Sequence, residues 1–113
     1  IDIMEAPGGK NGSVHWTVHY ASNGSGGSQS VGKSQNLGTV GDGKFHWYEV
    51  VWWREGYEFF VDNTSYFSNW DSNKRINASM YLMMGVEVNN NPSWHGTPPG
   101  GNWTQTMEVD RLE

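Results

Sequence analysis

The residues best suited to chemistry are two carboxylates at the start of the chain, Asp2 and Glu5, in the run Ile1-Asp2-Ile3-Met4-Glu5. This run is typical of a β-strand, in which successive side chains alternate between the two faces of a sheet. Plain alternation would place Asp2 and Glu5 on opposite faces. A β-bulge at Ile3-Met4 would add one residue and return Glu5 to the face of Asp2.

Two carboxylates on one face could act as an acid–base pair. Their repulsion raises the pKa of one, which stays protonated and can donate to a glycosidic oxygen while its neighbour stays ionised. The alternative interpretation is that Asp2 and Glu5 are ordinary solvated residues of an edge strand. These five residues by themselves leave both interpretations open.

The elements that would position the carboxylates are predicted to be β-strands. Short runs of β-branched and aromatic residues recur between Gly, Asn and Pro, and helical periodicity is hard to find. We expect strands at residues 1–5, 13–20, 45–53, 57–62, 78–88 and 104–112, with a short edge strand near 37–40 inside the Gly- and Ser-rich loop 23–43. The pattern predicts an all-β antiparallel sandwich, with the first and last strands incomplete.

The clearest structural prediction is a hairpin over residues 45–62. Arg54-Glu55-Gly56 separates two strand-like runs, and Gly56 is expected to supply a positive φ in the turn. The first of these strands carries aromatic residues on both faces. This predicts a strand that is covered on both sides between two packed sheets.

Composition limits the possible partners. The 113 residues suffice for one domain, and the formal charge of -5 with scattered Lys and Arg argues against a nucleic-acid partner. No apolar run is long enough to span a membrane, and the absence of Cys excludes disulfides and thiolate metal sites. Aromatic residues make up 14 %, including 7 Trp, although the mean hydropathy is -0.69. A polar chain rich in Trp favours a carbohydrate partner.

The run Ile1-Asp2-Ile3-Met4-Glu5 resembles the end of E-I-D-I-M-E, the active-site signature of glycoside hydrolase family 16 in its bulged form, as in laminarinase- and agarase-like members. Three further stretches resemble the same family in the same order, at residues 45–63, 81–84 and 105–110. The resemblance implies a jelly-roll, concanavalin A-like sandwich. Because the family's domain is longer than this chain, it also implies that residues 1–113 are the C-terminal part of a single catalytic domain.

The resemblance implies an endo-acting, retaining β-glycosidase that hydrolyses internal linkages of a polysaccharide, either a β-1,3- or mixed-linkage glucan or a β-galactan. By position, Glu5 is the proton donor and Asp2 the assisting carboxylate. The nucleophilic Glu of the signature would precede Ile1 and is missing from the sequence as given. Retention needs the two catalytic carboxyls about 5 to 5.5 Å apart. The alternative is a non-catalytic glycan-binding jelly-roll module, which would not need Glu5.

Further site residues follow from the resemblance. His19 stands where the family often has a histidine beside the carboxylates, although it could be a plain surface residue. Trp103 and Gln105 match family positions near the sugar. Trp16 and Trp94 are candidate stacking platforms, and hydrophobic packing is the alternative for each Trp.

Other positions depart from the family or are weaker candidates. Gly85 and Glu87 stand where glucan-cleaving relatives usually carry Asn and Ala, so the choice between glucan and galactan stays open. His15 lies four residues before His19 and could line the same cleft. No cofactor is required; a structural calcium is possible in the family, but Asp110 alone cannot make a metal site.

The sequence also carries signals for the location of the protein and for its folding. Asn-X-Ser/Thr sequons are compatible with a secreted, extracellular or periplasmic protein, and they occur at Asn11, Asn23, Asn63, Asn77 and Asn102. Without the strands that precede the catalytic one, sheet edges would be unpaired and apolar faces bare. We therefore expect the chain to need those strands to fold and to aggregate when isolated.

Overall fold

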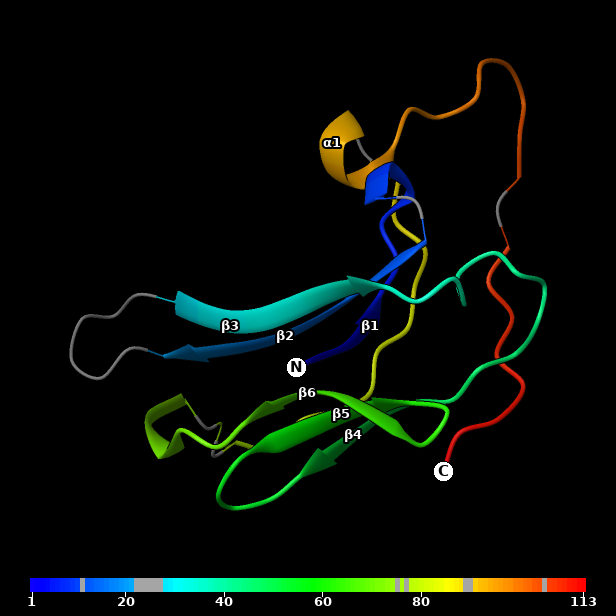
Figure 1. Cartoon of the computed structure of the whole chain (residues 1–113). Coiled ribbons are helices and arrows are strands. Elements are labelled where there is room, and N and C mark those ends of the chain that lie inside the picture. The colour runs from blue at the N-terminus through cyan, green and yellow to red at the C-terminus, as the bar shows by residue number, and fades with distance from the viewer. Residues whose placement is uncertain (11, 22–27, 75, 77, 89–90, 105) are drawn as a thin grey trace.

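The computed structural model describes residues 1–10, 12–21, 28–74, 76, 78–88, 91–104 and 106–113. Two three-stranded antiparallel sheets face each other (Figure 1). The first sheet has the order β1-β2-β3 and consists of β1 (Asp2–Glu5), β2 (Ser13–Ala21) and β3 (Ser28–Asn36). The second has the order β4-β5-β6 and consists of β4 (Tyr48–Trp52), β5 (Tyr57–Val61) and β6 (Thr64–Asn69). The predicted all-β antiparallel sandwich is confirmed.

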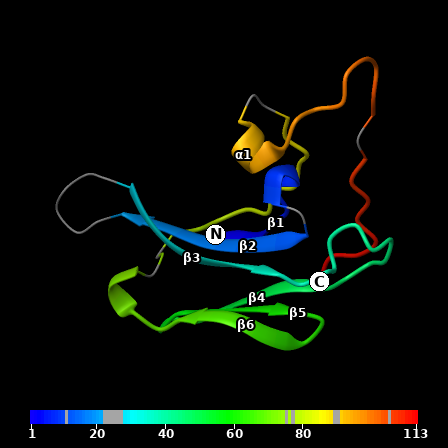
Figure 2. The ribbon, with the colours of Figure 1, turned by 45° about the horizontal axis from the view of Figure 1, so that its top comes forward.

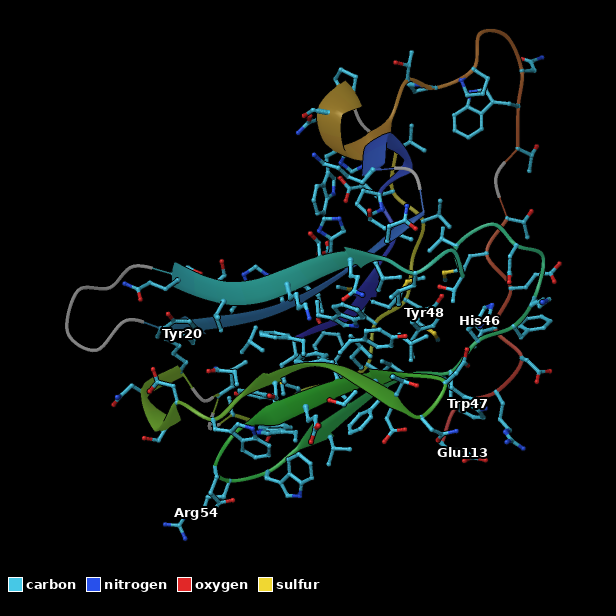
Figure 3. The ribbon with its side chains drawn as sticks, in the orientation of Figure 1. Tyr20, His46, Trp47, Tyr48, Arg54 and Glu113 are labelled. Carbon is cyan, nitrogen blue, oxygen red and sulfur yellow. The ribbon has the colours of Figure 1, made fainter. Side chains whose placement is uncertain are left out.

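Helical structure in the described residues is confined to single turns. These are the 3-10 turns η1 (Gly8–Lys10) and η2 (Ser72–Lys74) and the α-helical turn α1 (Pro92–His95). Tyr20 extends from the end of β2 toward η2, so this turn contacts the first sheet at one end of the sandwich (Figure 3). In the described part of the chain, no helix has the length and apolar character needed to cross a bilayer.

The core lies between the two sheets and is built by alternation along their central strands. It consists of Val14, Trp16 and Val18 from β2 and Tyr57, Phe59 and Val61 from β5, each at most 3 % exposed. Trp16 stacks on Tyr66 with ring centroids 5.8 Å apart, and Phe59 stacks on Phe67 at 5.3 Å. Each buried side chain of this kind stabilises the fold by roughly 1.5–3 kcal/mol. Because the even-numbered residues of β2 fill the core, its odd-numbered residues face away from it.

Strand β3 corrects the prediction of a loop over residues 23–43. It pairs with β2 along its whole length, from Ser13↔Asn36 to Ala21↔Ser28. Its side chains are mostly polar and exposed, so hydrophobic patterning does not reveal it. The backbone ladder to β2 supplies the hydrogen bonds that define the strand, and these do not depend on side-chain type.

The hairpin of β4 and β5 is confirmed, with pairing from Tyr48↔Val61 to Trp52↔Tyr57. The predicted positive φ at Gly56 is wrong. A Cβ there would collide with the carbonyl oxygen of Asn69, so the glycine is needed because β6 passes close to it. In the next turn, two residues other than glycine have a positive φ, Asp62 (48°) and Asn63 (65°). That turn leads into β6, a strand that the sequence analysis did not predict.

Because β6 joins the sheet, β5 is its central strand and β4 lies at its edge in the described structure. Trp47 is 42 % exposed and Trp53 is 40 % exposed, which corrects the expectation that this strand is covered on both sides. Trp53 packs against Trp70 at 5.3 Å, and the guanidinium of Arg111 lies 5.0 Å from the ring of Trp47. The outer face of this sheet is therefore only partly covered.

Two segments predicted as strands have no strand assignment in their described residues, 78–88 and 106–112. A strand is defined by a ladder of hydrogen bonds to a neighbour, and neither segment has such a ladder within the described residues. The turned view shows segment 78–88 passing along the free edge of β1 on its way to α1 (Figure 2). Its apolar side chains are exposed, among them Tyr81 at 85 % and Met83 at 79 %.

Candidate active site

The bulge predicted in β1 is present. Asp2 pairs with Thr17 and Glu5 pairs with His15, so β1 advances three positions while β2 advances two. The extra residue turns Glu5 to the same face as Asp2. Since the odd-numbered residues of β2 point away from the core, the two carboxylates lie on the open face of this sheet.

His19 joins the carboxylates on this face. Its Nε2 lies 2.7 Å from Oδ2 of Asp2, within hydrogen-bond distance. The side chain of Asp2 is 32 % exposed and that of His19 is 53 % exposed, so both remain accessible to a ligand. The bond holds Asp2 in place beside Glu5 and leaves the Glu5 carboxyl available for chemistry.

The surroundings of Glu5 favour its protonated form. Partial burial raises the pKa of Glu5, and the negative charge of Asp2 raises it further. The charge of His19 lowers the pKa of Glu5, and the charge of Glu87 raises it by a smaller amount. A carboxyl that keeps its proton to higher pH than usual is suited to act as a general acid.

A short wall stands next to this face and is formed by α1 and η1. Figures 1 and 2 show both turns beside each other, on the side of the first sheet that faces away from the second. Trp94 of α1 contacts the ring of His15 edge-on, with centroids 4.7 Å apart. Nε2 of His95 lies 3.9 Å from Oε1 of Glu87. This arrangement places Glu87 near the carboxylate pair rather than at a remote edge.

The surroundings of His15 favour its neutral form. Burial lowers the pKa of its imidazole, and the positive charge of Lys10 lowers it further. Its Nε2 is buried and has no hydrogen-bond partner among the described residues. A neutral imidazole can donate or accept one hydrogen bond at that atom, depending on its tautomer.

The remaining predicted site residues have different outcomes. Trp16 is fully buried in the core against Tyr66, which corrects its prediction as a stacking platform: the alternation of β2 turns it away from the open face. Trp103 is 39 % exposed in a segment without strand assignment, and its sugar contact stays a prediction. Gln105 lies outside the described residues.

One residue near the site was missed by sequence reasoning, His95. The signal available was local: Asn91-Pro92 can start a helical turn, because Pro is favoured in the first turn, and Trp94 stands in that turn. Its position next to Glu87, however, depends on the packing of α1 against η1. A pattern within the loop could not reveal that contact.

A metal has no suitable site in the described part of the chain. No group of three or more His, Cys, Asp or Glu side chains there is arranged to hold an ion. Calcium needs several oxygen ligands around one point. The structural calcium that the sequence resemblance allows stays a prediction, and no step of the chemistry is assigned to it.

Fold and site together define a β-sandwich with two neighbouring carboxylates on the open face of one sheet. Residues 1–111 match glycosyl hydrolases family 16, and the chain belongs to this family. It is 29 % identical over 126 aligned residues to glucan endo-1,3-beta-glucosidase A1 of Niallia circulans. That alignment covers 97 % of this chain but only 18 % of the relative's length. No solved structure matches the chain significantly.

Proposed function

We propose that this chain carries the acid/base half of the active site of an endo-acting, retaining β-glycosidase that hydrolyses internal linkages of a polysaccharide. The observation that carries the proposal is the position of Glu5, partly buried beside Asp2 on an open sheet face, where its pKa is raised. Membership of glycosyl hydrolases family 16 supports the reaction class.

In the proposed mechanism, Glu5 donates its proton to the glycosidic oxygen while a second carboxylate attacks the anomeric carbon. That nucleophile must lie about 5 to 5.5 Å from Glu5, and the family signature would place it immediately before Ile1. A water molecule then cleaves the glycosyl-enzyme ester and gives a proton back to Glu5. The charge of Asp2 raises the pKa of Glu5 and so favours its protonated form before the first step, and His19 holds Asp2. The reaction needs no cofactor.

The proposed substrates are a β-1,3-glucan, a mixed-linkage glucan or a β-galactan. The relative from Niallia circulans is named for a 1,3-β-glucan linkage, which supports the first. Glu87 lies near Glu5, where its charge affects the pKa of Glu5, and this departure from the usual glucanase pattern keeps the galactan in the proposal. Polysaccharides are too large to cross a membrane unaided, so we propose that the protein acts outside the cytoplasm.

The test is Glu5→Gln in a polypeptide that carries this chain with a Glu before Ile1. Loss of the general acid should lower kcat on the polysaccharide by roughly 10²–10⁴-fold. The matched control is Glu55→Gln, the same substitution at an exposed position in the β4–β5 turn. Full activity in Glu5→Gln would refute the assignment. Binding of polymer without any hydrolysis by the unsubstituted protein would instead favour a glycan-binding module.

A further inference from the structure

A pair of exposed tryptophans lies at one end of the second sheet, beside the β4–β5 turn. Trp53 follows β4 and is 40 % exposed, and Trp70 follows β6 and is 53 % exposed. Their ring centroids are 5.3 Å apart, and the two ring planes are inclined by 32°. Neither residue is among the buried residues of the core. The two indoles therefore form an open aromatic surface.

Alternation along the strands places both rings on the outer face of this sheet. Trp52 stacks on the buried ring of Tyr57 and lies on the inner side, so Trp53, the next residue, lies on the outer side. Phe67 packs against the core, so Trp70, three positions later, also lies on the outer side. The two carboxylates lie on the outer face of the other sheet. The tryptophan pair and the carboxylates are thus on opposite sides of the sandwich.

A glycine allows the two rings to meet. The backbone N–H of Trp53 donates a hydrogen bond to the carbonyl oxygen of Gly56 at 2.9 Å, which closes the turn. A Cβ on Gly56 would lie 3.0 Å from both Cα and Cε3 of Trp70. Because Gly56 has no side chain, the ring of Trp70 can lie over it and contact Trp53 on the other side. The backbone thus fixes the orientation of the rings before any ligand binds, which lowers the entropic cost of binding.

The size of the open aromatic surface indicates what can occupy it. With these exposed fractions, the two residues offer roughly 200 Å² to a ligand. A stable protein–protein interface covers about 800 Å² on each partner. The pair is therefore too small for stable association with a second copy of the chain, but it is large enough for one or two sugar rings.

The surroundings of the pair favour an uncharged ligand. Glu58 lies on the same outer face, two positions after Gly56 and about 7 Å from it along β5. Its Oε1 accepts a hydrogen bond from Oγ of Ser65 at 2.6 Å. A carboxylate here repels an anionic polymer, whereas its remaining lone pairs can accept hydrogen bonds from sugar hydroxyls. The C–H face of a neutral pyranose ring can pack on the open indoles.

We propose that Trp53 and Trp70 form a second binding site for a neutral polysaccharide, on the side of the sandwich opposite Glu5. Figure 3 shows Arg54 of the same turn pointing away from the first sheet, so this corner is remote from the carboxylates. A separate stretch of polymer must therefore occupy the site. Binding there raises the effective concentration of polymer near the carboxylates. This inference goes beyond the proposed function and rests on it only for the choice of polymer.

The experiment measures retention by an insoluble β-1,3-glucan of a polypeptide that carries this chain with a Glu before Ile1. Every variant also carries Glu5→Gln, so that the polymer is not cut. The double substitution Trp53→Ala and Trp70→Ala should weaken retention by about tenfold, because one of two attachments is lost. The matched control is Trp47→Ala, on the same face and similarly exposed but roughly 20 Å away along β4, which should be retained normally. Equal retention of the double variant and the control would overturn the proposal.

A second variant guards against misfolding of the first. Trp70→Leu keeps an apolar side chain over Gly56 but has no flat ring, so it should be retained several-fold more weakly with an unchanged circular dichroism melt. Retention of Trp70→Leu equal to that of its parent would contradict stacking on the indole.

The choice of ligand is tested with two further polymers. A neutral β-galactan is compared with the glucan, and retention by either that depends on the two tryptophans supports the proposal. Retention by neither, or stronger retention by a sulfated glucan than by a neutral one, would overturn it. Loss of self-association in the double variant, measured by sedimentation, with unchanged retention would assign the pair to a protein contact instead.

Failure of this site and failure of the proposed function give different results. If the protein with Glu5 intact cleaves the polysaccharide, and the double variant is retained normally, the hydrolase stands and the second site falls. If no cleavage is found but retention depends on Trp53 and Trp70, the second site stands and the hydrolase falls. If both stand, the double variant should lose activity several-fold on insoluble polymer and keep its kcat/KM on a short soluble oligosaccharide.

Discussion

At the scale of single residues, the site depends on an unequal pair of carboxyls. Asp2 is held by His19 through a 2.7 Å contact, whereas Glu5 is partly buried and feels the charges of Asp2 and Glu87. These surroundings favour the protonated form of Glu5, which is what a general acid requires.

Asp2→Asn tests this division of roles. The substitution keeps the size of the side chain but removes a charge that raises the pKa of Glu5, so that pKa should fall. Because Glu5 acts as an acid only while protonated, the alkaline limb of the pH–rate profile should move to lower pH. Carboxyl NMR of a polypeptide that carries this chain follows the Glu5 titration. An unchanged or higher Glu5 pKa in Asp2→Asn would contradict the proposed interaction.

Another residue-scale feature lies far from the site, at His46. Its Nδ1 lies 2.7 Å from Asp62 and its Nε2 lies 3.2 Å from Asp42, so the imidazole joins the loop before β4 to the β5–β6 turn. Asp62 also accepts a hydrogen bond from the Trp47 backbone N–H at 3.0 Å. Figure 3 shows His46 and Trp47 near the C-terminal Glu113.

This cluster predicts a pH dependence of stability. Hydrogen bonds to Asp62 and then to Asp42 raise the pKa of His46, so its stabilising effect is complete below about pH 6.5 and is lost as the pH rises through the raised value. The pKa of Asp62 is lowered, chiefly by His46, so its effect is lost as the pH falls below about 3.9.

The expected result is a larger Tm difference between the unsubstituted chain and His46→Gln at pH 5 than at pH 9. Thermal melts of both proteins across this range measure it. The difference between the two proteins isolates His46 from the other histidines. A Tm difference that stays constant with pH would show that the charge on His46 has no part in holding the loop.

At the scale of elements, the wall beside the site depends on glycines in η1. A Cβ on Gly9 would lie 2.6 Å from the carbonyl oxygen of Pro92 and 3.0 Å from the backbone nitrogen of Gly96. Only a residue without a side chain lets α1 approach so closely. The position of Trp94 against His15 therefore depends on the backbone of a neighbouring turn.

Gly9→Ala should displace α1 and with it Trp94. We expect the ring-current shift of the His15 imidazole protons to decrease, and oligosaccharide binding to weaken by a few-fold. Gly100→Ala is the control, because a Cβ there has no atom within 4 Å and the residue's φ is not positive. Retention of the His15 shift in Gly9→Ala would show that α1 does not depend on this contact.

At the scale of the whole molecule, the described structure leaves a large apolar surface open. It follows segment 78–88, where Tyr81 and Met83 are 85 % and 79 % exposed, next to the free edge of β1. Exposed apolar patches beside an unpaired strand edge favour association. The need for further strands and the aggregation of the isolated chain stay predictions.

The double substitution Tyr81→Ser and Met83→Ser should reduce concentration-dependent association of the chain. Its unfolding free energy should change by no more than about 0.5 kcal/mol, because neither side chain is buried. Phe59→Ala, at a fully buried position, should instead cost about 3–5 kcal/mol. Light scattering and denaturant melts measure both effects. If the double variant associates as strongly as the unsubstituted chain, association depends on a different surface.

Local patterns were enough to predict part of this fold. Alternation predicted β1, β2 and the β4–β5 hairpin, and the hypothesis that Asp2 and Glu5 share a face predicted the bulge that the register shows. The turn at Asp62-Asn63 was a usable signal for β6 that was not recognised. Segments 78–88 and 104–112 have strand-like sequences, but a strand also needs a partner, and pairing is not a local property.

The sequence by itself determined that two carboxylates share a strand and that the motifs resemble one family. Only the tertiary structure decided which face of that strand is open. Trp16 and His15 are neighbours of similar aromatic character, yet packing against β5 and β6 buries Trp16 and leaves His15 beside Glu5. Pairing with β2, another tertiary contact, turns a polar segment into β3. Alternation along the strand decides which side chains share a face. Which of the two faces becomes the core is decided only when the second sheet packs against it.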